Sequence, residues 1–457
     1  MIASELQKSS NLDLNHEIDL KGGKFDRTTK GNLVHAYSII SKDKPRDLCV
    51  FFHGGLTSRA EGLDLASQLM MPYTKSGSYP FFFIWNSDLL TTIREIIEPL
   101  YQDRVLIDGA NRAANLIAGK IGNAIGVRID GRRTSGLSGS RNSLLELPDI
   151  EKYLRPYEAA WRKQVGSQLG VSQKELEIFA MAIKALNTRV MAGRTRSRTS
   201  SLRGIDNPLF RIISRLNSGH DHGVYTTIVE EILICLGAKR LIGKPIWDRM
   251  KKDIEVSFSS APNAGGTEFV RELIACWANN PEMRVTLVGH SAGAIYLQRF
   301  VECLDAQLAP SAPQKVEIIT LAAATSFDRV AQGLSSLRRR VLKARTFGLD
   351  DARESGYWEI PLVYNKSLLY IVSSLCDDDP NDDRPILGMQ RYWNAKGIYD
   401  VSPINEVIAF FSQNNAVWAP SAKSAPAGYR SNAREHGDFP LDQETRDSVC
   451  YALQHGL

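Results

Sequence analysis

Short apolar runs alternate with helix-like spacing in two separated parts of the chain. Near the N-terminus, apolar runs at 48–52 and 79–85 flank a helical pattern at 59–71. Further on, apolar runs at 285–288 and 316–321 flank another helical pattern. Apolar runs without polar alternation are typical of parallel strands that are buried on both faces. The order therefore predicts an α/β protein with a mostly parallel central sheet flanked by helices.

The same patterns assign the remaining core elements. The segment 367–372 fits either a strand or a helix. Further strands are expected at 32–40, 344–349 and 416–418, and further helices at 268–277, 330–341 and 443–453.

A long insertion interrupts the core pattern after Trp85. Residues 98–250 carry 24 basic and 15 acidic side chains, whereas the whole chain has a net charge of only +5. Long insertions over strand ends form lids that shape a pocket. We therefore predict a core of residues 1–97 and 251–457 and an inserted, basic, mainly helical cap at 98–250. Helical spacing in this insertion recurs at 150–165, 174–186 and 226–236, and 193–201 alternates arginine with hydroxyl residues.

One Gly-x-Ser-x-Gly pentapeptide, 289–293, ends the apolar run 285–288 and precedes a helical pattern. A sharp turn between a strand and a helix needs small residues on both sides of its serine, because the backbone is strained and the helix passes close to the strand. Such a turn holds the hydroxyl clear of the sheet. Ser291 is therefore a candidate nucleophile.

Upstream, the strand expected at 48–52 ends in His53-Gly54-Gly55. Glycines let backbone N–H groups face a developing oxyanion without obstruction by side chains. An ordinary glycine turn is the competing interpretation, but the position upstream of the serine turn favours the oxyanion role. The expected donors are the N–H groups of Gly55 and Ala292, with Leu56 as a third.

A serine nucleophile needs a base, and in this chain order the base follows the serine. Two histidines remain, His436 and His455. His455 lies two residues from the end of the chain, where fraying hinders precise positioning. His436 lies between the strand expected at 416–418 and the last helix, so it is the predicted base.

The orienting acid has several candidates between the serine and His436. Asp350 and Asp351 directly follow the strand expected at 344–349, so we rank them first. Asp328 and the run Asp377–Asp379 rank behind, and charge runs of that kind are commonly solvated turns.

Together, the HGG motif, GHSAG, an acid and a histidine, in this order, resemble the α/β-hydrolase superfamily, and the two glycine motifs are similar to those of its bacterial lipases and esterases. The chain departs from the hormone-sensitive-lipase pattern at Leu56 and His290. The resemblance implies an α/β-hydrolase fold and a serine hydrolase that cleaves carboxylic esters through an acyl-enzyme. The same machinery can cleave amides, as in a serine peptidase or amidase, and a non-catalytic binding protein is a further alternative.

Composition constrains the setting of this chemistry. The six cysteines are scattered without CxxC pairs, which indicates reduced core thiols rather than disulfides or zinc ligands. The first residues lack a secretory signal and no apolar run approaches a membrane span, so a cytoplasmic protein is expected. No metal or organic cofactor is implied. The expected partners are a small-molecule or lipid ester and an anionic lipid surface, while basic loops without aromatics disfavour nucleic acid.

Overall fold

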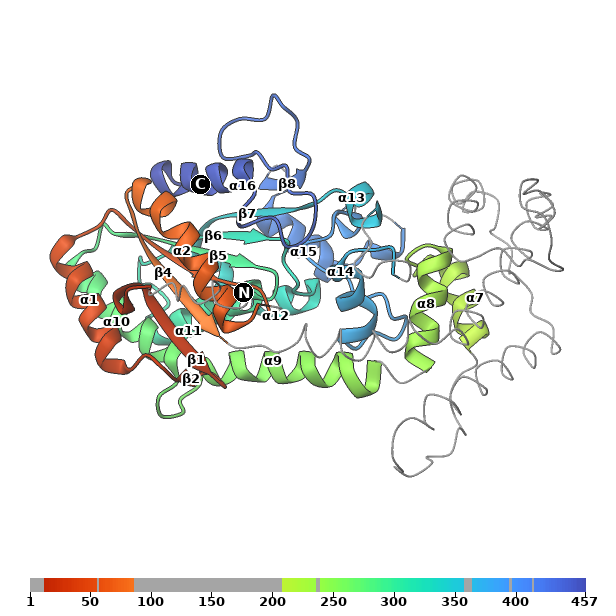
Figure 1. Ribbon diagram of the computed structural model, residues 1–457, viewed down its shortest axis with the longest axis horizontal. Helices are drawn as coiled ribbons and strands as arrows, with labels where there is room; N and C mark the ends of the chain where they lie inside the picture. The colour runs from red at the N-terminus through yellow and green to blue at the C-terminus, as the bar shows by residue number, and fades with distance from the viewer. Residues whose placement is uncertain are drawn as a thin grey trace, which may run out of the picture. The chain divides into compact units, whose positions relative to one another are not determined.

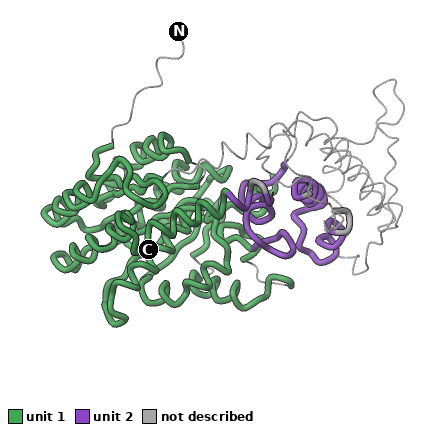
Figure 2. The backbone as a smooth tube through the Cα atoms, turned by 90° about the horizontal axis from the view of Figure 1, so that it is seen from below, with its two compact units in different colours: residues 1–90, 246–357, 385–457 green, residues 91–245, 358–384 purple. Residues whose placement is uncertain are grey.

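A computed structural model describes residues 12–55, 57–85, 208–235, 239–356, 364–393, 397–412 and 415–457. The chain divides into two compact units (Figure 2). Unit 1 comprises residues 1–90, 246–357 and 385–457, and unit 2 comprises residues 91–245 and 358–384.

Unit 1 contains an eight-stranded sheet in the order β2-β1-β4-β3-β5-β6-β7-β8 (Figure 1). Only β1 and β2 pair antiparallel, and the other neighbours are parallel. The predicted mostly parallel α/β sheet is thus present. The strands are β1 Glu17–Lys21, β2 Lys24–Phe25, β3 Asp47–Phe52, β4 Ser78–Trp85, β5 Arg284–His290, β6 Val316–Leu321, β7 Val341–Leu349 and β8 Ala416–Ala419.

Successive side chains on a strand point to opposite faces of the sheet. Because both sets are apolar and buried here, helices cover both faces. Phe51 lies on one face, with its ring centroid 6.5 Å from that of Tyr73 on α2. Phe52 lies on the other face and stacks on Tyr296 of α11 at 5.7 Å. The α-helices described in unit 1 are α1 Lys30–Asp43, α2 Arg59–Lys75, α9 Lys244–Ser257, whose first two residues belong to unit 2, α10 Gly265–Asn279, α11 Gly293–Gln307, α12 Phe327–Arg340, α13 Asp351–Gly356, α15 Ser402–Phe411 and α16 Gln443–His455.

The strand expected at 32–40 is wrong, because these residues lie in helix α1. Thr29 begins the helix by accepting a hydrogen bond from the N–H of Asn32, whose side chain bonds back to Thr29. This reciprocal capping satisfies donors that a helix start leaves open. The buried residues Leu33, Ala36, Tyr37 and Ile40 follow helical spacing.

Unit 2 contains α7 Pro208–Ser218, α8 Val224–Cys235 and α14 Leu368–Ile371, with π-helical turns at Lys239–Gly243 and Val372–Cys376. Helix α8 agrees with the helix expected at 226–236, and the segment 367–372 is helical. The helices expected at 150–165 and 174–186 and the arginine-rich loop 193–201 lie outside the described residues. The role of this region as a cap remains a prediction.

A buried ionic cluster joins the segments of unit 2. The guanidinium of Arg215 contacts the carboxylates of Glu230 at 2.8 Å and Glu231 at 3.1 Å. The ring of His222 lies between Glu230, at 2.7 Å, and Asp383, at 2.9 Å. Burial raises the pKa of Glu230, but His222 and Arg215 more than reverse this and lower it to about 2. The cluster is therefore charge-paired across segments that lie far apart in the sequence.

Among the described residues, no helix combines the length and the apolar character needed to cross a membrane.

Candidate active site

Ser291 lies in the turn between β5 and α11 with a φ of +54°, a conformation that side chains rarely adopt. Two glycines make the turn sterically feasible. A Cβ at Gly293 would overlap the carbonyl oxygen of Phe52, and one at Gly289 would lie 2.8 Å from the carbonyl oxygen of Gly293. The Ser291 N–H donates to the carbonyl of Leu321 at 2.9 Å, which ties the turn to β6. The turn thus has the strained geometry that its sequence predicts.

His436 lies in the loop between β8 and α16, and its Nε2 is 2.9 Å from Ser291 Oγ. The carboxylate of Asp438 shapes this loop by accepting from the N–H groups of Arg434, at 2.9 Å, and Glu435, at 3.2 Å. The structure therefore brings together the serine and the histidine that the sequence singled out.

Burial holds the pKa of His436 well below 6.5, and the nearby His290 lowers this pKa further. The ring is consequently neutral at pH 7. When Nε2 accepts the Ser291 hydroxyl proton, Nδ1 must carry the ring's own proton. That Nδ1 is buried and has no hydrogen-bond partner among the residues that the structure describes.

The His53-Gly54-Gly55 loop packs against the serine turn. A Cβ at Gly54 would lie 3.2 Å from Ser291 Cβ, and one at Gly55 would lie 2.9 Å from Ala292 Cβ. A side chain at Gly55 would force its neighbours to move, and one at Gly54 would make a tighter contact than a Cβ atom ordinarily makes. The loop for which the sequence predicts an oxyanion donor therefore lies directly beside Ser291 and Ala292, whereas Leu56 lies outside the described residues.

The buried ring of His53 stabilises this loop through two hydrogen bonds. Its Nδ1 donates to the carbonyl of Gly54 at 2.8 Å, and its Nε2 accepts from the N–H of Trp85 at 3.1 Å. Burial lowers the pKa of His53 to about 4, so the ring is neutral and can make one bond of each kind. His53 thereby links the ends of β3 and β4.

His290, the residue before the nucleophile candidate, has a structural contact that the sequence motifs do not indicate. Its Nε2 donates to the backbone carbonyl of His436 at 3.0 Å, and the two ring centroids are 5.4 Å apart. Burial lowers the pKa of His290 to about 4. No local sequence signal points to this contact, because its partners are 146 residues apart.

None of the acid candidates that the sequence offers forms a hydrogen bond with His436 Nδ1 in the described part of the chain. Asp350 Oδ1 accepts from the N–H of Arg353 at 2.8 Å and so caps the start of α13. Asp351 is exposed at the first position of α13, and its N–H donates to Gln390 Oε1 at 2.9 Å. Asp328 lies in the first turn of α12, and Asp377–Asp379 belong to unit 2. The structure thus shows the serine and histidine paired without a carboxylate bonded to the histidine among the described residues.

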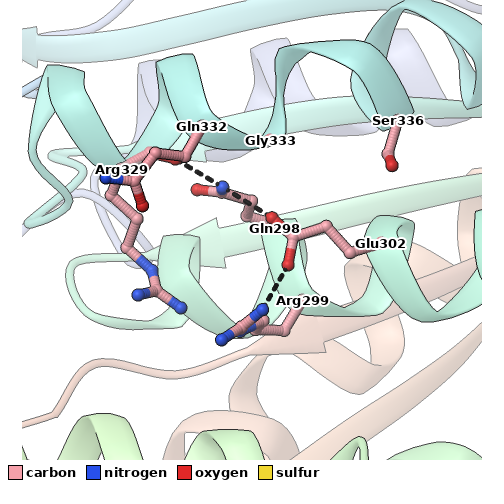
Figure 3. A pocket seen from close by; sticks show the side chains of 7 residues that line it. All are labelled: Gln298, Arg299, Glu302, Arg329, Gln332, Gly333 and Ser336. Atoms are coloured by element: carbon pink, nitrogen blue, oxygen red, sulfur yellow. Dashed lines mark hydrogen bonds and ion pairs between the residues drawn. The ribbon is translucent and has the colours of Figure 1, made fainter.

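A separate polar hollow of about 220 Å³ lies between α11 and α12 (Figure 3). Gln298 Nε2 donates to Glu302 Oε1 at 2.8 Å and to the carbonyl of Arg329 at 2.7 Å, and Arg299 pairs with Glu302 at 2.7 Å. Because these groups bond to one another, we interpret the hollow as part of the helix packing. The residues that line it are Gln298, Arg299, Glu302, Arg329, Gln332, Gly333 and Ser336.

Within the described ranges, no group of three or more His, Cys, Asp or Glu side chains is arranged to hold a metal ion. Comparisons with models of protein families, with curated proteins and with solved structures find no match to this chain.

Proposed function

We propose that the protein is a serine hydrolase of the α/β-hydrolase type that cleaves carboxylic esters. The observation that carries the proposal is the 2.9 Å contact between His436 Nε2 and the hydroxyl of Ser291, at a strained turn where φ is +54°. A serine within hydrogen-bond reach of a neutral imidazole is the arrangement that nucleophilic catalysis requires.

The proposed reaction has two acyl-transfer steps. His436 Nε2 takes the Ser291 proton as Oγ attacks the ester carbonyl. The N–H groups of Gly55 and Ala292 donate hydrogen bonds to the negative charge that develops on the carbonyl oxygen. The protonated His436 then donates to the leaving alcohol as the C–O bond breaks. In the second step His436 removes a proton from water as the water oxygen attacks the acyl-enzyme carbonyl. His436 then returns that proton to Ser291 Oγ as the acyl C–O bond breaks, which releases the acid and free Ser291.

The choice of ester follows from the arrangement of the base. An alcohol is a better leaving group than an amine, so its expulsion depends less on an accurately delivered proton. No carboxylate holds His436 Nδ1 among the described residues. We therefore propose ester cleavage as the main activity, with an anionic lipid ester as the physiological substrate class that the basic composition of residues 98–250 favours.

A fluorophosphonate probe tests the proposal, because it labels only activated serines. We expect the purified chain to be labelled and Ser291→Ala to abolish labelling. Ser78→Ala is the matched control, since Ser78 is also 4% exposed but lies at the start of β4. A folded protein that is not labelled, or labelling that persists in Ser291→Ala, would refute the proposal.

The preference between esters and amides is measured separately, with p-nitrophenyl esters and the matching p-nitroanilides. The proposal requires a higher kcat/KM for the ester of each pair, by more than the intrinsic difference in reactivity. Equal or better cleavage of the anilide would instead indicate an amidase.

A further inference from the structure

One imidazole contacts all three parts of the proposed active site. His290 is covalently joined to Ser291, and its Nε2 donates to the backbone carbonyl of His436 at 3.0 Å. Its Nδ1 lies against the glycine loop, where a Cβ on Gly54 would be 3.2 Å away. His290 is only 7% exposed, so these contacts are largely shielded from water.

The position of His290 is itself fixed. It is the last residue of β5, paired with Leu321 of β6, and the strained turn begins directly after it. The strand holds the backbone of His290 and burial restricts its ring, so the Nε2–H group is a well-positioned donor. The His436 carbonyl bonds to this donor, so the sheet that holds His290 also helps to fix the position of the His436 loop.

His436 needs support of this kind. Its ring bonds to Ser291 through Nε2, while Nδ1 has no hydrogen-bond partner among the described residues. In a serine-histidine-carboxylate triad, the carboxylate fixes the ring from the Nδ1 side. Here the fixed contact is to the backbone of the same residue.

We propose that His290 is the positioning residue for His436, holding the base against Ser291 through the hydrogen bond from His290 Nε2 to the His436 carbonyl. This inference rests on the proposed function. His290 touches neither substrate nor reacting atoms in this role, and it acts only by placing His436.

The experiment compares three substitutions of His290. Glutamine places an Nε2–H donor at about the same reach as histidine, asparagine places its donor one bond too short, and leucine has no donor. We expect His290→Asn and His290→Leu to lower kcat about 10²-fold, with KM changed less than about threefold, because a misplaced base costs rate and not binding. His290→Gln should recover most of the lost kcat.

A role confined to folding would give another pattern. It would lower the midpoint of thermal unfolding in all three variants in proportion to lost packing and would leave kcat per folded molecule unchanged. Asn and Gln variants of equal kcat, or all three within about twofold of the parent, would overturn the proposal. If His290→Leu does not fold, the comparison of Gln with Asn still decides.

Crystal structures of the Gln and Asn variants give a readout that does not depend on turnover. The proposal requires the distance between His436 Nε2 and Ser291 Oγ to stay near 2.9 Å in His290→Gln and to lengthen in His290→Asn. An unchanged distance in both refutes the positioning role even if the protein hydrolyses esters. If the distance lengthens only in the Asn variant but the protein hydrolyses no ester, the proposed function is refuted and the positioning role of His290 stands.

Discussion

The guanidinium of Arg353 donates to the backbone carbonyl of Asn432 at 3.1 Å, and so links the helix after β7 to the loop that carries His436. A second bond from Arg353 reaches the carbonyl of Ala433. Asp350 caps the same short helix by accepting from the N–H of Arg353. The helix that follows β7 therefore supports the His436 loop through hydrogen bonds from the Arg353 guanidinium to two backbone carbonyls.

The first prediction concerns the acid. Because Asp350 acts as a helix cap and asparagine caps equally well, we expect Asp350→Asn to keep kcat within about threefold of the parent. Asp351→Asn, at an exposed position, is the control and should be neutral. A loss of kcat approaching 10⁴-fold in Asp350→Asn would instead identify it as a triad acid, since that is the scale seen when such a carboxylate is neutralised.

The second prediction concerns Ser291 and His436 as a unit. Each alanine substitution should remove nearly all esterase activity, by on the order of 10⁴-fold or more in kcat, because neither residue acts without the other. The double variant should be no worse than either single variant. Steady-state kinetics on a p-nitrophenyl ester measures this, and a double variant that loses the product of the two single effects would contradict the coupling.

The third prediction is the pH dependence of kcat/KM. Burial holds the pKa of His436 well below 6.5, and only the neutral ring can accept the Ser291 proton. Activity should therefore be constant from pH 8 to pH 6.5 and fall only as the pH drops further, through the lowered pKa. Rate measurements on an uncharged ester across this range provide the test. A midpoint at or above 6.5 would show that the ring is not desolvated as the structure indicates.

The fourth prediction tests the close packing of the serine turn. Gly293→Ala places a methyl group on the carbonyl of Phe52, and should cost about 1–3 kcal/mol in the free energy of unfolding, as overpacked sites do. Gly437→Ala, beside His436, meets no atom within 4 Å and should change stability by less than about 0.5 kcal/mol. Urea denaturation of both variants decides, and equal stabilities would argue against the close approach of α11 to β3.

The fifth prediction concerns the buried cluster of unit 2. Arg215→Met removes the cation that Glu230 and Glu231 share, while Arg211 stays paired with Glu231 and His222 stays beside Glu230. The loss should therefore be about 3 kcal/mol in the free energy of unfolding, at the low end for breaking a buried ion pair. Arg271→Met breaks a pair with Glu268 whose arginine is 55% exposed, and should cost less than about 1 kcal/mol. Denaturation of the full chain compares the two. Similar losses would mean that the Arg215 cluster is hydrated.

Much of the sheet could be predicted because its strands have a strong local pattern. The run Leu48–Phe52 is apolar at every position, as a strand buried on both faces must be, and it lies in β3. The segment 32–40 misled because Val34, Tyr37, Ile39 and Ile40 all favour strands. The capping by Thr29 and the helical spacing of the buried side chains outweigh that propensity.

The site was predictable to a smaller extent. The Gly-x-Ser-x-Gly motif indicates Ser291 and chain order indicates His436; the structure places the two in contact, although their catalytic roles stay predictions. The contact of His290 could not be foreseen, since a hydrogen bond to a backbone carbonyl leaves no trace in the identity of the residue that accepts it. The use of Asp350 as a cap depends on α13, which is too short to show a periodic pattern.

The two pieces of unit 2 also impose an order on synthesis. Glu230, in the first piece, accepts a hydrogen bond from the hydroxyl of Tyr364, in the second, at 2.6 Å. Between them the ribosome must make residues 246–357, which belong to unit 1 and include β5, β6 and β7. Because domains fold as their chain emerges, α8 cannot contact Tyr364 until most of the sheet has left the ribosome. During that interval Glu230 can bond only to groups of its own piece and to water. A chain that ends before Tyr364 therefore lacks the groups that complete the cluster, Tyr364 and Asp383.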